Sequence, residues 1–126
     1  MDILPTILEL AQVPHPGTSF RGRDVVLPRG RSWVDHLRAP EEHPAIHDDE
    51  NHIHGWELFG NRAIRKGNWK AVLLARERSE SWELYNVGED PAEQRNLAEE
   101  RPEMLQELLE HWATYVAETG MVEELF

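Results

Sequence analysis

The residues of this sequence that could take part in chemistry gather between positions 39 and 54, a stretch rich in acidic residues and histidine. The candidates are His47, Asp48, His52 and His54, because imidazole and carboxylate groups bind metals and hydrogen-bond to polar ligands. Histidines in such loops more often hydrogen-bond locally or line the edge of a cleft than hold a metal. We therefore expect these four residues at the rim of a substrate cleft.

A metal site is the less favoured interpretation of the same stretch. His47 and Asp48 could converge with His52 and His54 on Zn²⁺, for which imidazole and carboxylate are suitable ligands. Their spacing matches no firm zinc pattern, however. We expect no metal to be held by this chain.

The remainder of the sequence contains no self-contained catalytic motif. It has no cysteine, which excludes thiolate nucleophiles, thiolate metal sites and disulfides. It also has no dinucleotide-binding fingerprint, phosphate-binding loop, nucleophile elbow or zinc-ligand helix. The sequence therefore predicts no catalytic residue.

Length and charge limit the kinds of partner. The chain has 126 residues, which favours a single domain, and its 24 acidic and 13 basic residues give a net charge of −11. This balance disfavours binding to nucleic acid or to anionic membrane surfaces. No segment approaches the roughly 20 apolar residues of a membrane span, and no secretory leader is evident. We favour a cytoplasmic location on these grounds.

The segment from residue 62 to residue 87 predicts three adjacent antiparallel strands. Lys66-Gly67-Asn68 is a turn signal between two apolar segments, since Gly takes the positive φ that a tight turn needs. After a polar break at residues 76–81, the run W-E-L-Y-N-V (82–87) predicts the third strand. We expect Ala45–Asp48 to add an edge strand.

Two helices are expected to flank these strands. A long helix from Pro102 to Gly120 has an apolar stripe that would cover the sheet, made of Leu105, Leu108, Leu109, Trp112 and Val116. A short N-terminal helix, capped by Asp2, has an apolar face made of Leu4, Ile7, Leu8 and Ala11.

Two shorter helical signals lie between these elements. Ser32 is placed to cap a short helix that contains Val34 and Leu37. Asp90-Pro91-Ala92-Glu93 reads as a capping box over a single helical turn, with Leu97 as an apolar plug after it.

Five stretches, in order, resemble the C-terminal end of sulfatases, most closely bacterial arylsulfatases. They are D-I-L-P-T-I-L-E-L-A-Q-V (2–13), G-R-S-W-V (30–34), R-A-I-R-K-G-N-W-K-A-V (62–72), W-E-L-Y-N-V (82–87) and D-P-A-E-Q-R-N-L-A (90–98). The resemblance implies an α+β subdomain with a four-stranded antiparallel sheet, a long packed helix and a short N-terminal helix. Residues 1–126 would form one domain, in which helix 1–12 belongs to the large domain of full sulfatases and 13–126 is the C-terminal subdomain.

The resemblance also implies what the chain lacks. Sulfatases hydrolyse sulfate esters with a formylglycine, made from the first residue of a C/S-x-P-x-R motif, and with a Ca²⁺ held by Asp and Asn. The sequence contains no such motif, so the chain alone is predicted to be inactive, without cofactors, and to support the cleft rim of a sulfatase catalytic domain. The alternative is a standalone interaction module that forms a homodimer through Leu4, Ile7 and Leu8.

Overall fold

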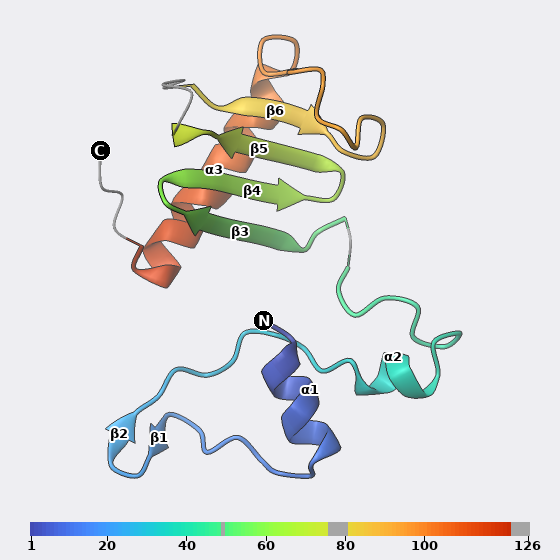
Figure 1. Cartoon of the computed structure of the whole chain (residues 1–126), viewed down its shortest axis with the longest axis vertical. Helices are drawn as coiled ribbons and strands as arrows, with labels where there is room; N and C mark the ends of the chain where they lie inside the picture. The colour runs from blue at the N-terminus through green and yellow to red at the C-terminus, as the bar shows by residue number, and fades with distance from the viewer. Residues whose placement is uncertain (49, 76–80, 122–126) are drawn as a thin grey trace. The chain divides into compact units, whose positions relative to one another are not determined.

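The computed structural model describes residues 1–48, 50–75 and 81–121. The chain divides into two compact units, Met1–Asp48 and Asp49–Phe126. None of the described helices is long and apolar enough to cross a membrane. The elements, labelled in Figure 1, are α1 (Ile3–Leu10), β1 (Ser19–Phe20), β2 (Arg23–Asp24), α2 (Val34–Arg38), β3 (Ile53–Leu58), β4 (Asn61–Lys66), β5 (Trp69–Leu73), β6 (Glu83–Asn86) and α3 (Pro102–Thr119).

The second unit is built on a four-stranded antiparallel sheet in the order β3-β4-β5-β6. This confirms the predicted sheet. β4 and β5 are joined by the two-residue turn Gly67-Asn68, because Lys66 and Trp69 are directly opposed. Gly67 has a φ of +56°, the left-handed conformation that the turn signal predicted.

Helix α3 covers one face of this sheet, as its apolar stripe predicted, and Figure 1 shows it running behind the strands. Leu108 and Trp112 from the helix are buried against a layer of strand residues, Ile64, Ala71 and Leu84. The helix ends at Gly120, whose φ of +67° allows its N–H to donate to the Val116 carbonyl. The apolar residues on one face of the strands therefore pack against the apolar stripe of α3 and form one core with it.

The edge strand predicted at Ala45–Asp48 is wrong. These residues form no strand, and the fourth strand is β3 (Ile53–Leu58), all six residues of which are paired with β4. The sequence signal for β3 is weak, because glycine is disfavoured in the interior of a strand. In the structure Gly55 lies within β3 where Tyr115 of α3 packs closest, and there is no room for a Cβ atom.

The predicted capping box at residues 90–93 is also wrong. No helical turn forms there, and Glu93 has a φ of +54°. The Asp90 carboxylate instead accepts hydrogen bonds from the backbone N–H groups of Gln94 and Arg95. Glu93 is drawn away by Lys70, whose ammonium it pairs with. Beyond this loop, Leu97 packs against the core as predicted.

The first unit contains α1, α2 and the small β1–β2 hairpin. The predicted helix α1 is confirmed, but Asp2 makes no capping hydrogen bond to it. Its carboxylate instead accepts a hydrogen bond from the Arg31 backbone N–H and lies 2.8 Å from His47 Nε2. Thr6 is buried, and its hydroxyl oxygen accepts a hydrogen bond from the Trp33 backbone N–H. At the start of α2, the Ser32 hydroxyl accepts a hydrogen bond from the Val34 N–H.

Candidate functional site

The sheet face turned away from α3, called the open face below, carries a row of polar side chains. Directly opposed residues of an antiparallel sheet share a face, and the pairing aligns His54 with Arg65, Arg65 with Lys70, and Lys70 with Tyr85. The core residue Ile64 points to the opposite face, which α3 covers. One row across all four strands therefore presents an imidazole, a guanidinium, an ammonium and a phenol on the open face.

A polar pocket lies at one end of this row. It has a volume of about 370 Å³ and is lined by Glu50, His52, His54, Arg65, Gly67 and Asn68. His52 and His54 form one wall, with their rings 4.2 Å apart and nearly perpendicular. The β4–β5 turn forms the other wall. The pocket thus lies between the residues that precede β3 and the tight turn that connects β4 to β5.

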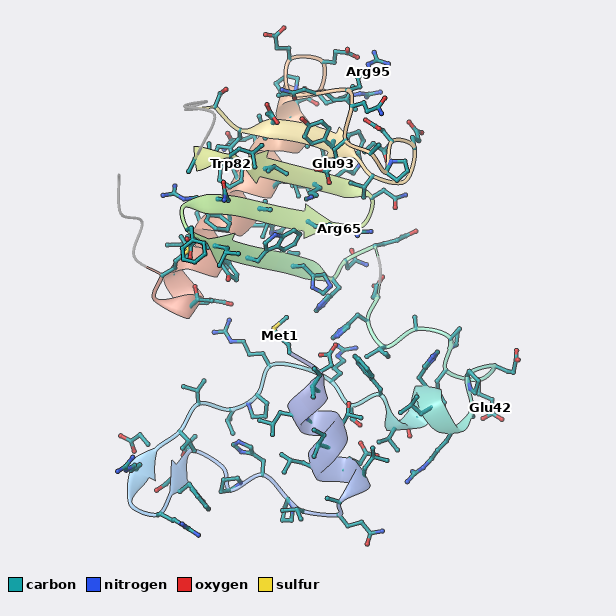
Figure 2. The ribbon with its side chains drawn as sticks, viewed as in Figure 1. Met1, Glu42, Arg65, Trp82, Glu93 and Arg95 are labelled. Carbon is teal, nitrogen blue, oxygen red and sulfur yellow. The ribbon has the colours of Figure 1, made fainter. Side chains whose placement is uncertain are left out.

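Arg65 is the cation of the polar pocket (Figure 2). Its Nε atom donates a hydrogen bond of 2.8 Å to the Gly67 carbonyl, which holds the plane of the guanidinium against the turn. Within the described ranges its two terminal nitrogens donate to no residue. A guanidinium held in this way offers a planar pair of donors, a geometry that matches two oxygens of one anion.

A wider groove of about 630 Å³ follows on the same face, and its lining residues Lys70, Glu83 and Glu93 are bound within the protein. Lys70 pairs with Glu93, and its ammonium lies 5.7 Å from the centre of the Trp56 ring. The Tyr85 hydroxyl donates a hydrogen bond to Glu83. This groove therefore stabilises the sheet through its own contacts, and the polar pocket is the better ligand site.

The four residues predicted from the sequence divide between the two units. His52 and His54 lie together in the polar pocket, as neighbours of Arg65. His47 belongs to the first unit, where it is bound to Asp2, and Asp48 is an exposed residue of that unit. A common cleft rim made by all four residues stays a prediction.

The sequence reasoning missed Arg65 and Asn68. Both residues lie in or beside the turn that the Lys66-Gly67-Asn68 motif predicted. Only the register of β3, however, shows that His54 lies directly beside Arg65. Once Ile53–Leu58 is recognised as the edge strand, alternation puts His52 and His54 on one face.

The described part of the chain contains no group of three or more His, Asp or Glu side chains that could hold a metal. The sequence also lacks a C/S-x-P-x-R motif. The residues present therefore fit neither a Ca²⁺ site nor the precursor of a formylglycine, and no chemical step can be assigned to them through either group.

The chain was compared with known proteins. No family model matches it. An uncharacterized sulfatase of Schizosaccharomyces pombe is 54% identical over 123 residues, which cover 97% of this chain and 22% of that protein. The chain belongs to the sulfatase family. Arylsulfatase K of Danio rerio is 30% identical over 109 residues, which cover 86% of this sulfatase chain and 20% of the fish protein. The chain thus spans about a fifth of the length of the curated relatives that it matches.

Solved structures agree with this assignment at the level of the fold. A protein from a Bacteroides thetaiotaomicron locus for the metabolism of multiple glycosaminoglycans has a TM-score of 0.64 at 20% identity, over 90% of this chain and 24% of that chain. A protein solved in complex with its substrate D-glucosamine-2-N,6-O-disulfate has a TM-score of 0.60 at 20% identity, over 92% and 23% of the two chains. The sulfatase chain shares the fold of a part of each.

Proposed function

We propose that this chain is the C-terminal subdomain of an arylsulfatase-like sulfuric ester hydrolase. Its sheet and α3 support the fold, and the polar pocket contributes to the rim of the substrate cleft. The observation that carries the proposal is the 54% identity to a sulfatase over 97% of the chain. The chemistry would belong to the remaining four-fifths of such an enzyme, because the polar pocket contains no hydroxyl or thiol nucleophile.

The substrate and cofactors belong to the same proposal. A fold relative was solved with a sulfated glucosamine as its substrate, which supports a sulfated sugar as the ligand of the cleft. The complete enzyme would use Ca²⁺ and a formylglycine, both held by residues outside this chain. Packing against a sulfatase catalytic domain and a cytoplasmic location remain predictions.

A chimera tests the proposed function. The S. pombe sulfatase is the host, and its matching segment is replaced by this chain, since 54% identity over 123 residues should preserve the packing contacts. Hydrolysis of 4-nitrophenyl sulfate in the presence of Ca²⁺ is measured for the host, the chimera and the host with the segment deleted. We expect the chimera to keep activity within about tenfold of the host and the deletion to lose it.

The controls separate failure of folding from failure of function. The 126-residue chain alone should give no turnover, and turnover by it would contradict the absence of catalytic residues. A chimera that elutes as a folded protein with the thermal stability of the host, yet has no activity where the host is active, would overturn the proposal.

Self-association through α1 is a second candidate function, favoured by one observation. Leu4 and Ile7 are 49% and 56% exposed, whereas Leu8 is half-buried. Adjacent exposed apolar side chains on one helix are typical of a surface that another protein covers. Residues Ala45–Asp48 form no strand, so they offer no strand edge for pairing with a second chain.

Light scattering at increasing concentration tests this second candidate. We expect the 126-residue chain to approach the mass of a dimer and Leu4→Glu/Ile7→Glu to remain a monomer. Glu9→Gln, an exposed change elsewhere on α1, is the control and should behave as the wild type. A wild-type chain that stays monomeric at the highest concentration would exclude the homodimer.

A further inference from the structure

We propose that the polar pocket recognises an anionic substituent of a sugar, a sulfate or a carboxylate, and that Arg65 is the residue that binds it. The inference rests on the proposed function for the sugar, and it goes further in naming the recognised group and the residue. The group bound here would be an anion that is not hydrolysed, since the pocket lining contains no hydroxyl or thiol nucleophile.

The contacts of the neighbouring cations single out Arg65. Lys66 and Lys70 lie on the same hairpin, and each pairs with a carboxylate, from Glu107 and Glu93 respectively. The guanidinium of Arg65 is held only by its Nε atom, through an uncharged carbonyl. Its positive charge is therefore not neutralised by any ion pair among the described residues.

The geometry of Arg65 suits an anion with two adjacent oxygens. The hydrogen bond to Gly67 fixes the side chain at the turn, so little conformational entropy is lost when a ligand binds. The two terminal nitrogens lie in one plane with Nε and can donate in parallel to a sulfate or a carboxylate. The chain has a net charge of −11, which repels anions in general, so binding of an anion in this pocket depends on the local positive charge of Arg65.

The remaining lining residues suit the hydroxyl groups of a sugar ring. The amide of Asn68 both donates and accepts hydrogen bonds, and the carboxylate of Glu50 accepts them. The perpendicular rings of His52 and His54 provide a wall with both apolar edges and polar nitrogens. An inorganic anion would engage Arg65 alone, whereas a sugar acid or sugar sulfate can contact both walls.

A titration of the 126-residue chain followed by ¹⁵N NMR tests the inference. The probes are N-acetylglucosamine 6-sulfate, glucuronic acid and N-acetylglucosamine, each added to about 50 mM because monosaccharides bind single subsites weakly. We expect either or both charged probes to shift the amide signals of Gly67 and Asn68 and the Nε–H signal of Arg65. The neutral sugar should not. Comparison of the charged probes distinguishes sulfate from carboxylate recognition.

Two variants make the test specific. Arg65→Gln should weaken binding of the charged probe by about tenfold or more, because a charge-assisted pair of hydrogen bonds is lost. Arg95→Gln removes an equally basic side chain that is 70% exposed and paired with Glu100, and it should leave binding unchanged. Unshifted signals with every charged probe, equal shifts with the neutral sugar, or equal binding by Arg65→Gln would each overturn the inference.

The result can be separated from that of the chimera. An active chimera together with no binding of charged probes would leave the proposed function standing and remove this inference. Arg65-dependent binding together with a chimera that is folded but inactive would establish the anion site and refute the sulfatase role.

Discussion

Gly55 of β3 and Tyr115 of α3 approach so closely that a Cβ atom on Gly55 would lie 2.5 Å from the Tyr115 ring. The edge strand can therefore pack on the helix only without a side chain at position 55. The same contact positions β3, and with it His54, beside Arg65 of β4. A packing requirement on one face of the sheet thus determines which residues meet on the other face.

Gly55→Ala should destabilise the second unit. The added methyl group cannot be accommodated unless the Tyr115 ring or the strand moves, and overpacking of this kind costs about 1–3 kcal/mol. Urea unfolding measures the loss. In the double variant Gly55→Ala/Tyr115→Ala the loss should be much less than the sum of the two single losses. Strict additivity would show that the two residues do not constrain each other.

Leu108→Ala should destabilise the second unit by about 2–5 kcal/mol, because the side chain is fully buried between α3 and the sheet. Thermal or urea unfolding gives the value. Gln106→Ala, an exposed change on the same helix, is the control and should alter stability by less than about 0.5 kcal/mol. Equal effects of the two changes would contradict the observed packing of α3.

The Lys70–Glu93 pair should be coupled more strongly than the surface pair Arg95–Glu100. The side chains of the first pair are 20% and 29% exposed, whereas those of the second are 70% and 54% exposed. A double-mutant cycle with Lys70→Met and Glu93→Gln should give a coupling free energy of about 1 kcal/mol or more. The corresponding cycle for Arg95 and Glu100 should give a value near zero, because solvent screens exposed charges.

The Asp2 carboxylate should make the first unit sensitive to acid. Burial by itself raises the pKa of this group, but hydrogen bonds from His47, the Arg31 backbone and Trp33 outweigh burial and lower the pKa from 3.8 to about 2. A carboxyl whose pKa is depressed by folding stabilises the fold above its unfolded pKa, and the contribution is lost as the pH falls through the folded pKa. The stabilisation is therefore complete above about pH 5 and is lost towards about pH 2.

The backbone N–H of Arg31 donates to the Asp2 carboxylate, and that of Trp33 donates to the Thr6 hydroxyl oxygen. The amide NMR signals of Arg31 and Trp33 therefore report on the surroundings of Asp2 in an acid titration. Asp2→Asn should be less stable than the wild type at neutral pH, and the difference should narrow as the pH approaches 2. A difference that is independent of pH would show that the charge on Asp2 contributes nothing to the stability of the first unit.

Much of the second unit could be predicted from the sequence, because local patterns specify its elements. The apolar stripe around Leu108 has the period of a helix, and Gly67 supplies the positive φ of a two-residue turn. The sulfatase likeness rested on the order of several short motifs, and it was confirmed by relatives that cover nearly the whole chain.

The tertiary structure decided what depends on partners distant in the sequence. Glu93 could have closed a local capping box, but its carboxylate instead pairs with the ammonium of Lys70 on β5, a bond in which both partners are charged. Asp2 could have capped α1, but Arg31 and His47 engage its oxygens instead. In both cases the carboxylate bonds to a donor that is distant in the sequence and not to a backbone N–H group of its own segment.

The candidate site shows the same division. The sequence by itself determined the sulfatase family, the helix α3, the β4–β5 turn and the presence of His52 and His54 near the start of the sheet. Only the register of β3 decided that His54 lies beside Arg65, because a shift by one residue would turn every side chain of the strand to the opposite face. That register depends on the fit of Gly55 against Tyr115, a contact between residues 60 positions apart in the chain.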